Sequence, residues 1–99
     1  MRMDLADFRK SLVSATPPRG LSAELHALWC EAKGEWDQAH GLVQDLESDA
    51  AAWVHAYLHR KEGDLSNAGY WYRRAQKATP SASLESEWES LVTTLLRDS

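Results

Sequence analysis

The sequence predicts an all-helical fold in which about six helices form a short array of helical hairpins. Two observations predict this fold class. Apolar residues recur with a period near 3.6 residues and never with a period of 2, which favours helices and leaves no strand. In addition, a His-Ala pair, a Gly-acid-apolar turn and a following alanine occur twice, 29 residues apart, with the turns at Gly34 and Gly63. Repeats with periods of 20–50 residues are typical of stacked supersecondary units.

Length and composition indicate a single ordered domain. The chain has 99 residues, which is enough for one hydrophobic core. Its hydrophobic fraction of 43% and charged fraction of 26% are ordinary for globular proteins. The net charge of −4 argues against a nucleic-acid partner, because binding to phosphates requires a basic face.

Several features predict where the protein is found. Cys30 is the only cysteine, so the chain cannot form an internal disulfide, and this favours a reducing compartment. Residues 1–7 contain acids where a secretory signal requires an apolar segment. No apolar run approaches the length of a membrane span. We therefore expect a cytoplasmic protein without a membrane partner.

The first two helices are bounded by capping and helix-breaking residues. Asp4 can cap a helix whose apolar stripe ends near Ala15. Residues 16–20 contain two prolines and form a linker, because proline cannot continue a helix. A second helix is expected over Leu21–Lys33, and Gly34 ends it. The apolar faces of these helices contain Leu5, Phe8, Leu12 and Val13, and then Leu21, Leu25, Leu28, Trp29 and Ala32.

The other helices are separated by similar boundary residues. We expect them over Glu35–Glu47, from a cap at Ser48 or Asp49 to Glu62, over Asp64–Ala78, and after Pro80. Their apolar faces contain Trp36, Ala39, Leu42, Val43 and Leu46, then Trp53, Val54, Tyr57 and Leu58, and in the last helix Leu84, Trp88, Leu91, Val92 and Leu95.

The second copy of the pattern resembles the second half of a tetratricopeptide repeat. The turn Gly63, the alanines Ala68 and Ala75 and the closing Pro80 have the spacing of that family, and Tyr72 stands where the family places an aromatic residue. Upstream, Ala56 stands at the small residue of the repeat's first helix. In the earlier copy Ala27, Gly34 and Ala39 match the family pattern, whereas Leu46 replaces the second alanine. The spacing of 29 residues is shorter than the family's 34, so we expect a turn to shorten the second helix of the earlier copy.

The resemblance covers Leu21 to Pro80 and implies a right-handed array of two hairpins. Residues 1–20 would then form a capping helix and linker, residues 21–80 the two repeats, and residues 81–99 a C-terminal capping helix. Small side chains at Ala68 and Ala75 would let two antiparallel helices approach closely.

The resemblance also implies a function. In this family the first helices of successive repeats line a concave groove that receives a peptide or a partner segment. The corresponding residues are Trp53, Tyr57, Arg60 and Lys61 in the second copy and Leu21, Glu24, Leu28 and Glu31 in the first. Arginine beside aromatic residues suits an acidic ligand. We therefore expect a non-catalytic module that binds a protein or peptide partner, or a second copy of itself, since two repeats make only a short groove.

Catalytic motifs are missing from the sequence. It has no Gly-x-Ser-x-Gly elbow and no glycine-rich phosphate loop. The acidic residues Glu85, Glu87 and Glu89 are interpreted as a solvated face of the last helix. We expect neither an enzyme nor a bound cofactor.

The histidines are the main departure from the family pattern and leave an alternative open. Where the family places large residues of the first helix, this chain has Ala52, His55 and His59, and the earlier copy has Ala23, His26 and Cys30. His55 and His59 stand one turn apart, with Glu62 on the same side, a spacing that can chelate a metal. The alternative function is therefore a small-molecule or metal-binding protein, which could include catalysis, with a site that also involves Asp64 and residues 70–74. The favoured interpretation is that the histidines are core residues with hydrogen-bond partners.

Overall fold

The computed structural model describes residues 3–98 and contains six helices and no strand within them. They are α1 (Leu5–Ser11), α2 (Ala23–Ala32), α3 (Trp36–Val43), α4 (Asp49–Glu62), α5 (Leu65–Arg74) and α6 (Leu84–Asp98). The predicted all-helical fold class is confirmed. No helix in the described part of the chain is long and apolar enough to cross a membrane.

Side-chain caps and glycines set most of the helix ends. Asp4, Ser22, Ser48 and Asp64 each accept a hydrogen bond from the backbone N–H three residues ahead, which satisfies one of the free donors of the first turn. Between the helices, Gly34 and Gly63 have φ values of 87° and 92°. Only glycine adopts this region without strain, so both predicted turns are confirmed.

Three helices end earlier than the sequence predicts. Instead of reaching Ala15, α1 ends at Ser11, and Val13 is 91% exposed rather than part of the apolar stripe. Likewise α3 ends at Val43, because polar residues follow and Leu46 has no core to enter. The end of α5 at Arg74 coincides with a positive φ of 60° at Gln76, which turns the chain away before Ala78.

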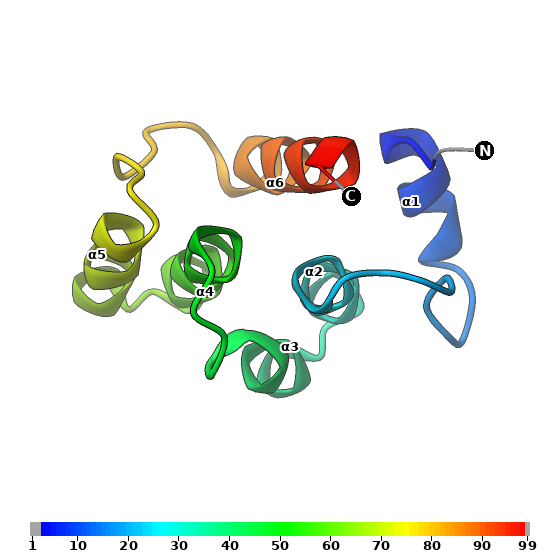
Figure 1. Ribbon diagram of the computed structural model, residues 1–99, viewed down its shortest axis with the longest axis horizontal. Coiled ribbons are helices and arrows are strands. Elements are labelled where there is room, and N and C mark those ends of the chain that lie inside the picture. The colour runs from blue at the N-terminus through cyan, green and yellow to red at the C-terminus, as the bar shows by residue number, and fades with distance from the viewer. Residues whose placement is uncertain (1–2, 99) are drawn as a thin grey trace.

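The helices surround a central pair formed by α2 and α4 (Figure 1). In this view α3 lies below the central pair, α5 lies beside α4, and α6 crosses above both central helices with α1 next to it. The longest dimension of the molecule is 36 Å. The C-terminal helix therefore covers the side of α2 and α4 that faces away from α3.

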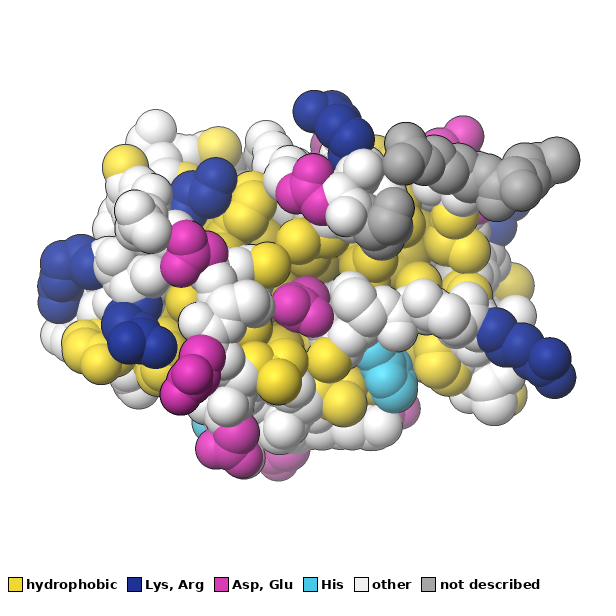
Figure 2. Space-filling model, viewed as in Figure 1, with side chains coloured by type: hydrophobic (Ala, Val, Ile, Leu, Met, Phe, Trp, Pro, Cys, Tyr) yellow, Lys and Arg dark blue, Asp and Glu magenta, His cyan; other side chains and the backbone are white. Residues whose placement is uncertain are grey.

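Two groups of buried side chains hold this arrangement together. The main core contains Phe8, Leu28, Leu58 and Leu91, which come from α1, α2, α4 and α6 and are fully buried. A smaller cluster joins α4 to α5 and consists of Ala56, Ala68 and Tyr72. The predicted contact at Ala68 is thus confirmed, and Ala75 at the end of α5 is also buried. On the face drawn in Figure 2, hydrophobic side chains reach the surface between α6 and the helices below it.

Candidate functional site

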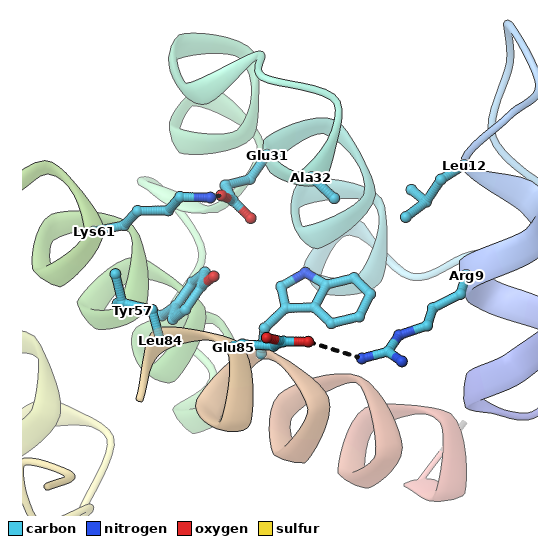
Figure 3. A pocket seen from close by; sticks show the side chains of 9 residues that line it. Arg9, Leu12, Glu31, Ala32, Tyr57, Lys61, Leu84 and Glu85 are labelled. Atoms are coloured by element: carbon cyan, nitrogen blue, oxygen red, sulfur yellow. Dashed lines mark hydrogen bonds and ion pairs between the residues drawn. The ribbon is translucent and has the colours of Figure 1, made fainter. Parts of the chain in front are cut away.

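An open groove lies where α1, α2, α4 and the start of α6 meet (Figure 3). Its volume is about 480 Å³. The lining residues that bear apolar side chains are Leu12, Ala32, Leu84 and Trp88, and those that bear polar groups are Arg9, Glu31, Tyr57, Lys61 and Glu85. A mostly apolar cleft with a few polar groups is the usual form of a ligand pocket.

Two ion pairs hold the charged groups of the groove. Lys61 pairs with Glu31, whose side chain is almost completely buried, and the Lys61 side chain remains 44% exposed. On the other side, the Arg9 guanidinium lies 3.9 Å from Glu85 and also pairs with Glu89. Because Lys61 and Arg9 are both partly exposed, each can also approach a ligand in the groove.

Tyr57 supplies a free polar group at the wall of the groove. The residue is only 2% exposed, and its hydroxyl makes no hydrogen bond with any described residue. Figure 3 shows this hydroxyl directed into the groove. Burial raises the pKa of Tyr57, and the nearby Glu31 and Glu87 raise it further. The phenol is therefore neutral at physiological pH and can donate a hydrogen bond.

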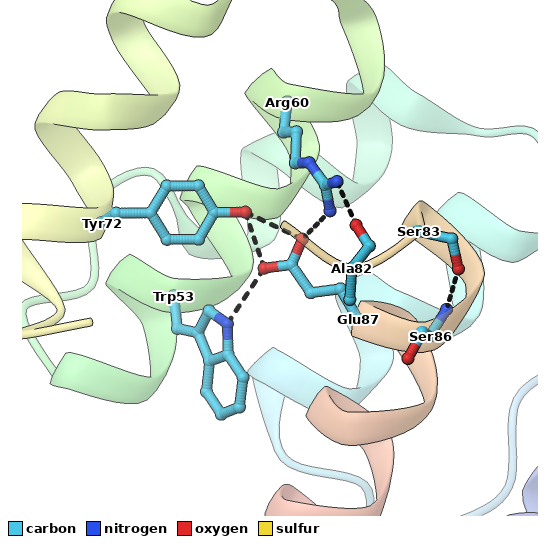
Figure 4. A network of polar contacts seen from close by, with 7 residues as sticks. All are labelled: Trp53, Arg60, Tyr72, Ala82, Ser83, Ser86 and Glu87. Atoms are coloured by element: carbon cyan, nitrogen blue, oxygen red, sulfur yellow. Dashed lines mark hydrogen bonds and ion pairs between the residues drawn. The ribbon is translucent and has the colours of Figure 1, made fainter. Parts of the chain in front are cut away.

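The structure divides the residues predicted to line one concave surface. Glu31, Tyr57 and Lys61 come together in the groove, whereas Leu28 is fully buried in the core. Trp53 and Arg60 instead point at Glu87 of α6 (Figure 4). The expectation that Trp53, Tyr57 and Arg60 share one exposed face is therefore wrong, because α6 covers this side of α4. The other two predicted residues lie apart from the groove: Glu24 accepts a hydrogen bond from Ser48, and Leu21 packs against the core.

Glu87 was not recognised as a functional or structural residue in the sequence, and the expectation that it is solvated is wrong. Its carboxylate is buried and accepts hydrogen bonds from Trp53 Nε1 at 3.2 Å and Arg60 Nη1 at 2.8 Å. The Tyr72 hydroxyl also donates to it, and burial, followed by this hydrogen bond, strongly raises the pKa of Tyr72. These contacts join α6 to α4 and α5.

A second cluster of functional groups lies on the other side of α4. His40 of α3 and His55 and His59 of α4 place nitrogen atoms within 4.8 Å of one another. The Nε2 atoms of His40 and His55 are 3.0 Å apart. In the same cluster, Nδ1 of His59 lies 2.6 Å from Oε2 of Glu62. His55 and His59 are buried, and His40 is partly exposed.

Tryptophans from two helices enclose the histidine cluster. Trp71 of α5 stacks on His55 with ring centroids 3.9 Å apart, and Trp36 stacks on His40 at 5.0 Å. Burial lowers the pKa of His55 to about 4, and the neighbouring His40 and His59 also lower it. Burial likewise lowers the pKa of His40. Burial therefore favours the neutral, lone-pair-bearing forms of His40 and His55.

The sequence identified only part of this cluster. His55, His59 and Glu62 lie together as their spacing predicts, and Asp64 also lies within 4.8 Å of His59 and Glu62. His40 was not predicted to belong to this cluster, because it comes from α3 and no local spacing relates it to His55 and His59. Cys30 and His26 belong to no such cluster among residues 3–98, and burial raises the pKa of the Cys30 thiol. His55 and His59 are buried, and their ring nitrogens contact His40 and Glu62 rather than the backbone.

No family model matches the chain, and no curated protein and no solved structure matches it significantly. The groove and the histidine cluster are therefore the features that indicate a function.

Proposed function

We propose that this protein is a non-catalytic, tetratricopeptide-like interaction module that binds a carboxylate-bearing peptide segment of a protein partner. The observation that carries the proposal is the groove between α1, α2, α4 and α6, which the free phenol of Tyr57 lines together with the partly exposed cations Lys61 and Arg9. The peptide carboxylate would accept a hydrogen bond from Tyr57 and would lie near Lys61 and Arg9.

The apolar lining defines the rest of the ligand. Leu12, Leu84 and Trp88 offer a surface for an apolar side chain beside the bound carboxylate. The groove volume of about 480 Å³ suits a few side chains rather than a whole domain. The ligand that fits is therefore a short segment in which an acidic residue stands next to a large apolar one.

The packing of the helices supports the comparison with tetratricopeptide repeats. α2 packs on α3 and α4 packs on α5 as neighbouring pairs, and alanines lie at the second contact. In the resemblance, the ligand lies on the first helices of the repeats, which here correspond to α2 and α4. Since α6 covers part of that side of α2 and α4, we propose that the ligand binds in the groove beside the start of α6.

A peptide selection tests this proposal. Random peptides displayed on phage are selected on the full chain, and the affinities of the selected peptides are measured by calorimetry. We expect the selected peptides to combine an acidic and a large apolar residue. A hydrogen bond to a charged group contributes about 1.5–3 kcal/mol, so Tyr57→Phe should weaken binding about tenfold or more. Arg9→Gln should also weaken binding.

Two matched variants serve as controls. Tyr70→Phe removes an exposed hydroxyl on α5, and Lys10→Gln removes a charge next to Arg9 but outside the groove. Both should bind the peptides like the wild type. Peptides that bind equally well to Tyr57→Phe, Arg9→Gln and the wild type would contradict the proposal, as would a selection that enriches no peptide.

A further inference from the structure

We propose that His40, His55 and His59 form a binding site for a divalent transition metal, with Zn²⁺ as the ion that its donors fit best. This site is independent of the proposed peptide groove. Residues two apart on a helix are rotated by about 200°, so His55 and His59 face away from Tyr57 and Lys61 on α4.

The distances between the donors are close to those around a bound ion. Zinc–imidazole bonds are about 2.0–2.1 Å long, so two nitrogens on a tetrahedral zinc lie about 3.3 Å apart. The Nε2 atoms of His40 and His55 are 3.0 Å apart, and all three donor nitrogens lie within 4.8 Å. Small rotations of the rings therefore bring the three lone pairs onto one ion.

Glu62 provides the outer contact that metal-binding histidines usually have. A ligating histidine commonly donates a hydrogen bond from its second ring nitrogen to a carboxylate. This contact fixes the ring and makes the ligand more basic. Nδ1 of His59 lies 2.6 Å from Oε2 of Glu62, and this contact leaves Nε2 of His59 free for the ion. A protein carboxylate thus already orients one of the three rings.

The hydrogen bonds within the cluster do not use every ring nitrogen of His55. Among the described residues, Nδ1 of His55 is the one buried side-chain nitrogen or oxygen that has no hydrogen-bond partner. An ion bound at Nε2 of His55 would leave the ring proton on Nδ1, so Nδ1 is not itself a ligand. Only one proton can lie between the facing Nε2 atoms of His40 and His55, whereas an ion uses the lone pairs of both.

The surroundings decide which ions fit and how they enter. Three imidazoles favour zinc, copper, nickel or cobalt over calcium and magnesium, which prefer oxygen ligands. Trp36 and Trp71 hold the rings of His40 and His55 by stacking, and the partly exposed His40 leaves a route to solvent. Water can then complete a tetrahedral site, and the ion would link α3 to α4.

The test uses the full chain without a polyhistidine tag, because such a tag binds the same ions. After chelator treatment, Zn²⁺ is titrated by calorimetry and Co²⁺ by visible absorption. We expect one ion per chain and the intense absorption of tetrahedral cobalt. His40→Gln, His55→Gln and His59→Gln should each weaken binding at least about tenfold, and Glu62→Gln about 10–100-fold.

His26→Gln is the matched control, because it removes the one histidine outside the cluster and should leave metal affinity unchanged. His40→Gln is the most informative cluster variant, since His40 is partly exposed and its loss should leave the circular dichroism spectrum unchanged. The proposal is overturned if the wild type gives only the weak spectrum of hydrated cobalt. It is also overturned if folded His40→Gln binds Zn²⁺ as tightly as the His26→Gln control.

Discussion

The Tyr72 hydroxyl of α5 donates a hydrogen bond to the buried Glu87 carboxylate of α6, with 2.6 Å between Oη and Oε2 (Figure 4). The same carboxylate pairs with Arg60 of α4 at 2.8 Å. Three helices therefore meet at one charged group. Because every strong partner of Glu87 comes from α4 or α5, these contacts fix the position of α6 across the central helices.

We expect Glu87→Ala to lower the free energy of unfolding by about 3 kcal/mol, because removing one partner of a buried pair leaves the other uncompensated. Glu85→Ala is the matched control on the same helix, since the Glu85 side chain is 81% exposed. Its effect should stay below about 1 kcal/mol. Urea denaturation measures both values, and equal losses would contradict a structural role for the Glu87 contacts.

Local sequence signals predicted the helices but not how α6 packs. The caps at Asp4 and Ser48 and the glycine at Gly63 are contained in a few neighbouring residues, so they could be found directly. Glu87 stands in the same kind of sequence as Glu85 and Glu89. Its burial depends on partners that stand 15 to 34 residues away, and no local pattern reports such contacts.

In the candidate sites, too, the sequence predicted local spacings but not contacts between distant parts of the chain. His55, His59 and Glu62 share one helix, so their spacing predicted their proximity. His40 reaches them from α3 only because α3 packs beside α4. The groove was likewise predicted in part, since α6 and Arg9 of α1 complete it from distant parts of the chain.

We expect Ala68→Leu to destabilise the protein by about 1–3 kcal/mol, because added methylenes in a packed contact force side chains and backbone apart. Ala68 is 1% exposed and lies against Ala56 and Tyr72. The control is Ala78→Leu in the exposed segment after α5, which should have little effect. A thermal or urea melt compares them, and a neutral Ala68→Leu would mean that the α4–α5 contact is looser than described.

Two glycine substitutions should have opposite effects. Gly41 lies in α3, and nothing within 4 Å would meet an added Cβ, so Gly41→Ala should stabilise by about 0.5–1 kcal/mol. Gly63→Ala meets no neighbour either, but its φ of 92° disfavours any side chain. We expect Gly63→Ala to cost about 1–2 kcal/mol in a urea melt. Effects of the same sign would contradict the helix boundaries given for α3 and α4.

In the metal-free protein, stability should fall as the pH is lowered through the range in which His55 titrates. Its pKa is about 4 in the folded protein, against an ordinary value of 6.5. Between these values the unfolded chain binds more protons than the folded chain, so the free energy of unfolding rises with pH. The contribution of His55 to the free energy of unfolding is complete above about pH 6.5 and is lost below about pH 4. At about 1.4 kcal/mol per pKa unit, it amounts to about 3 kcal/mol.

Urea melts in the presence of a chelator, at several pH values between 4 and 7, measure this dependence. His40 and His59 face His55, and a positive charge on either of them lowers the pKa of His55 further. His55→Gln should therefore flatten the profile, because it removes the group whose charged form is excluded from the fold. His26→Gln, which lies outside the cluster, should keep the slope of the wild type. If His55→Gln and His26→Gln give the same slope, the acid sensitivity comes from other groups and His55 is not held neutral by burial.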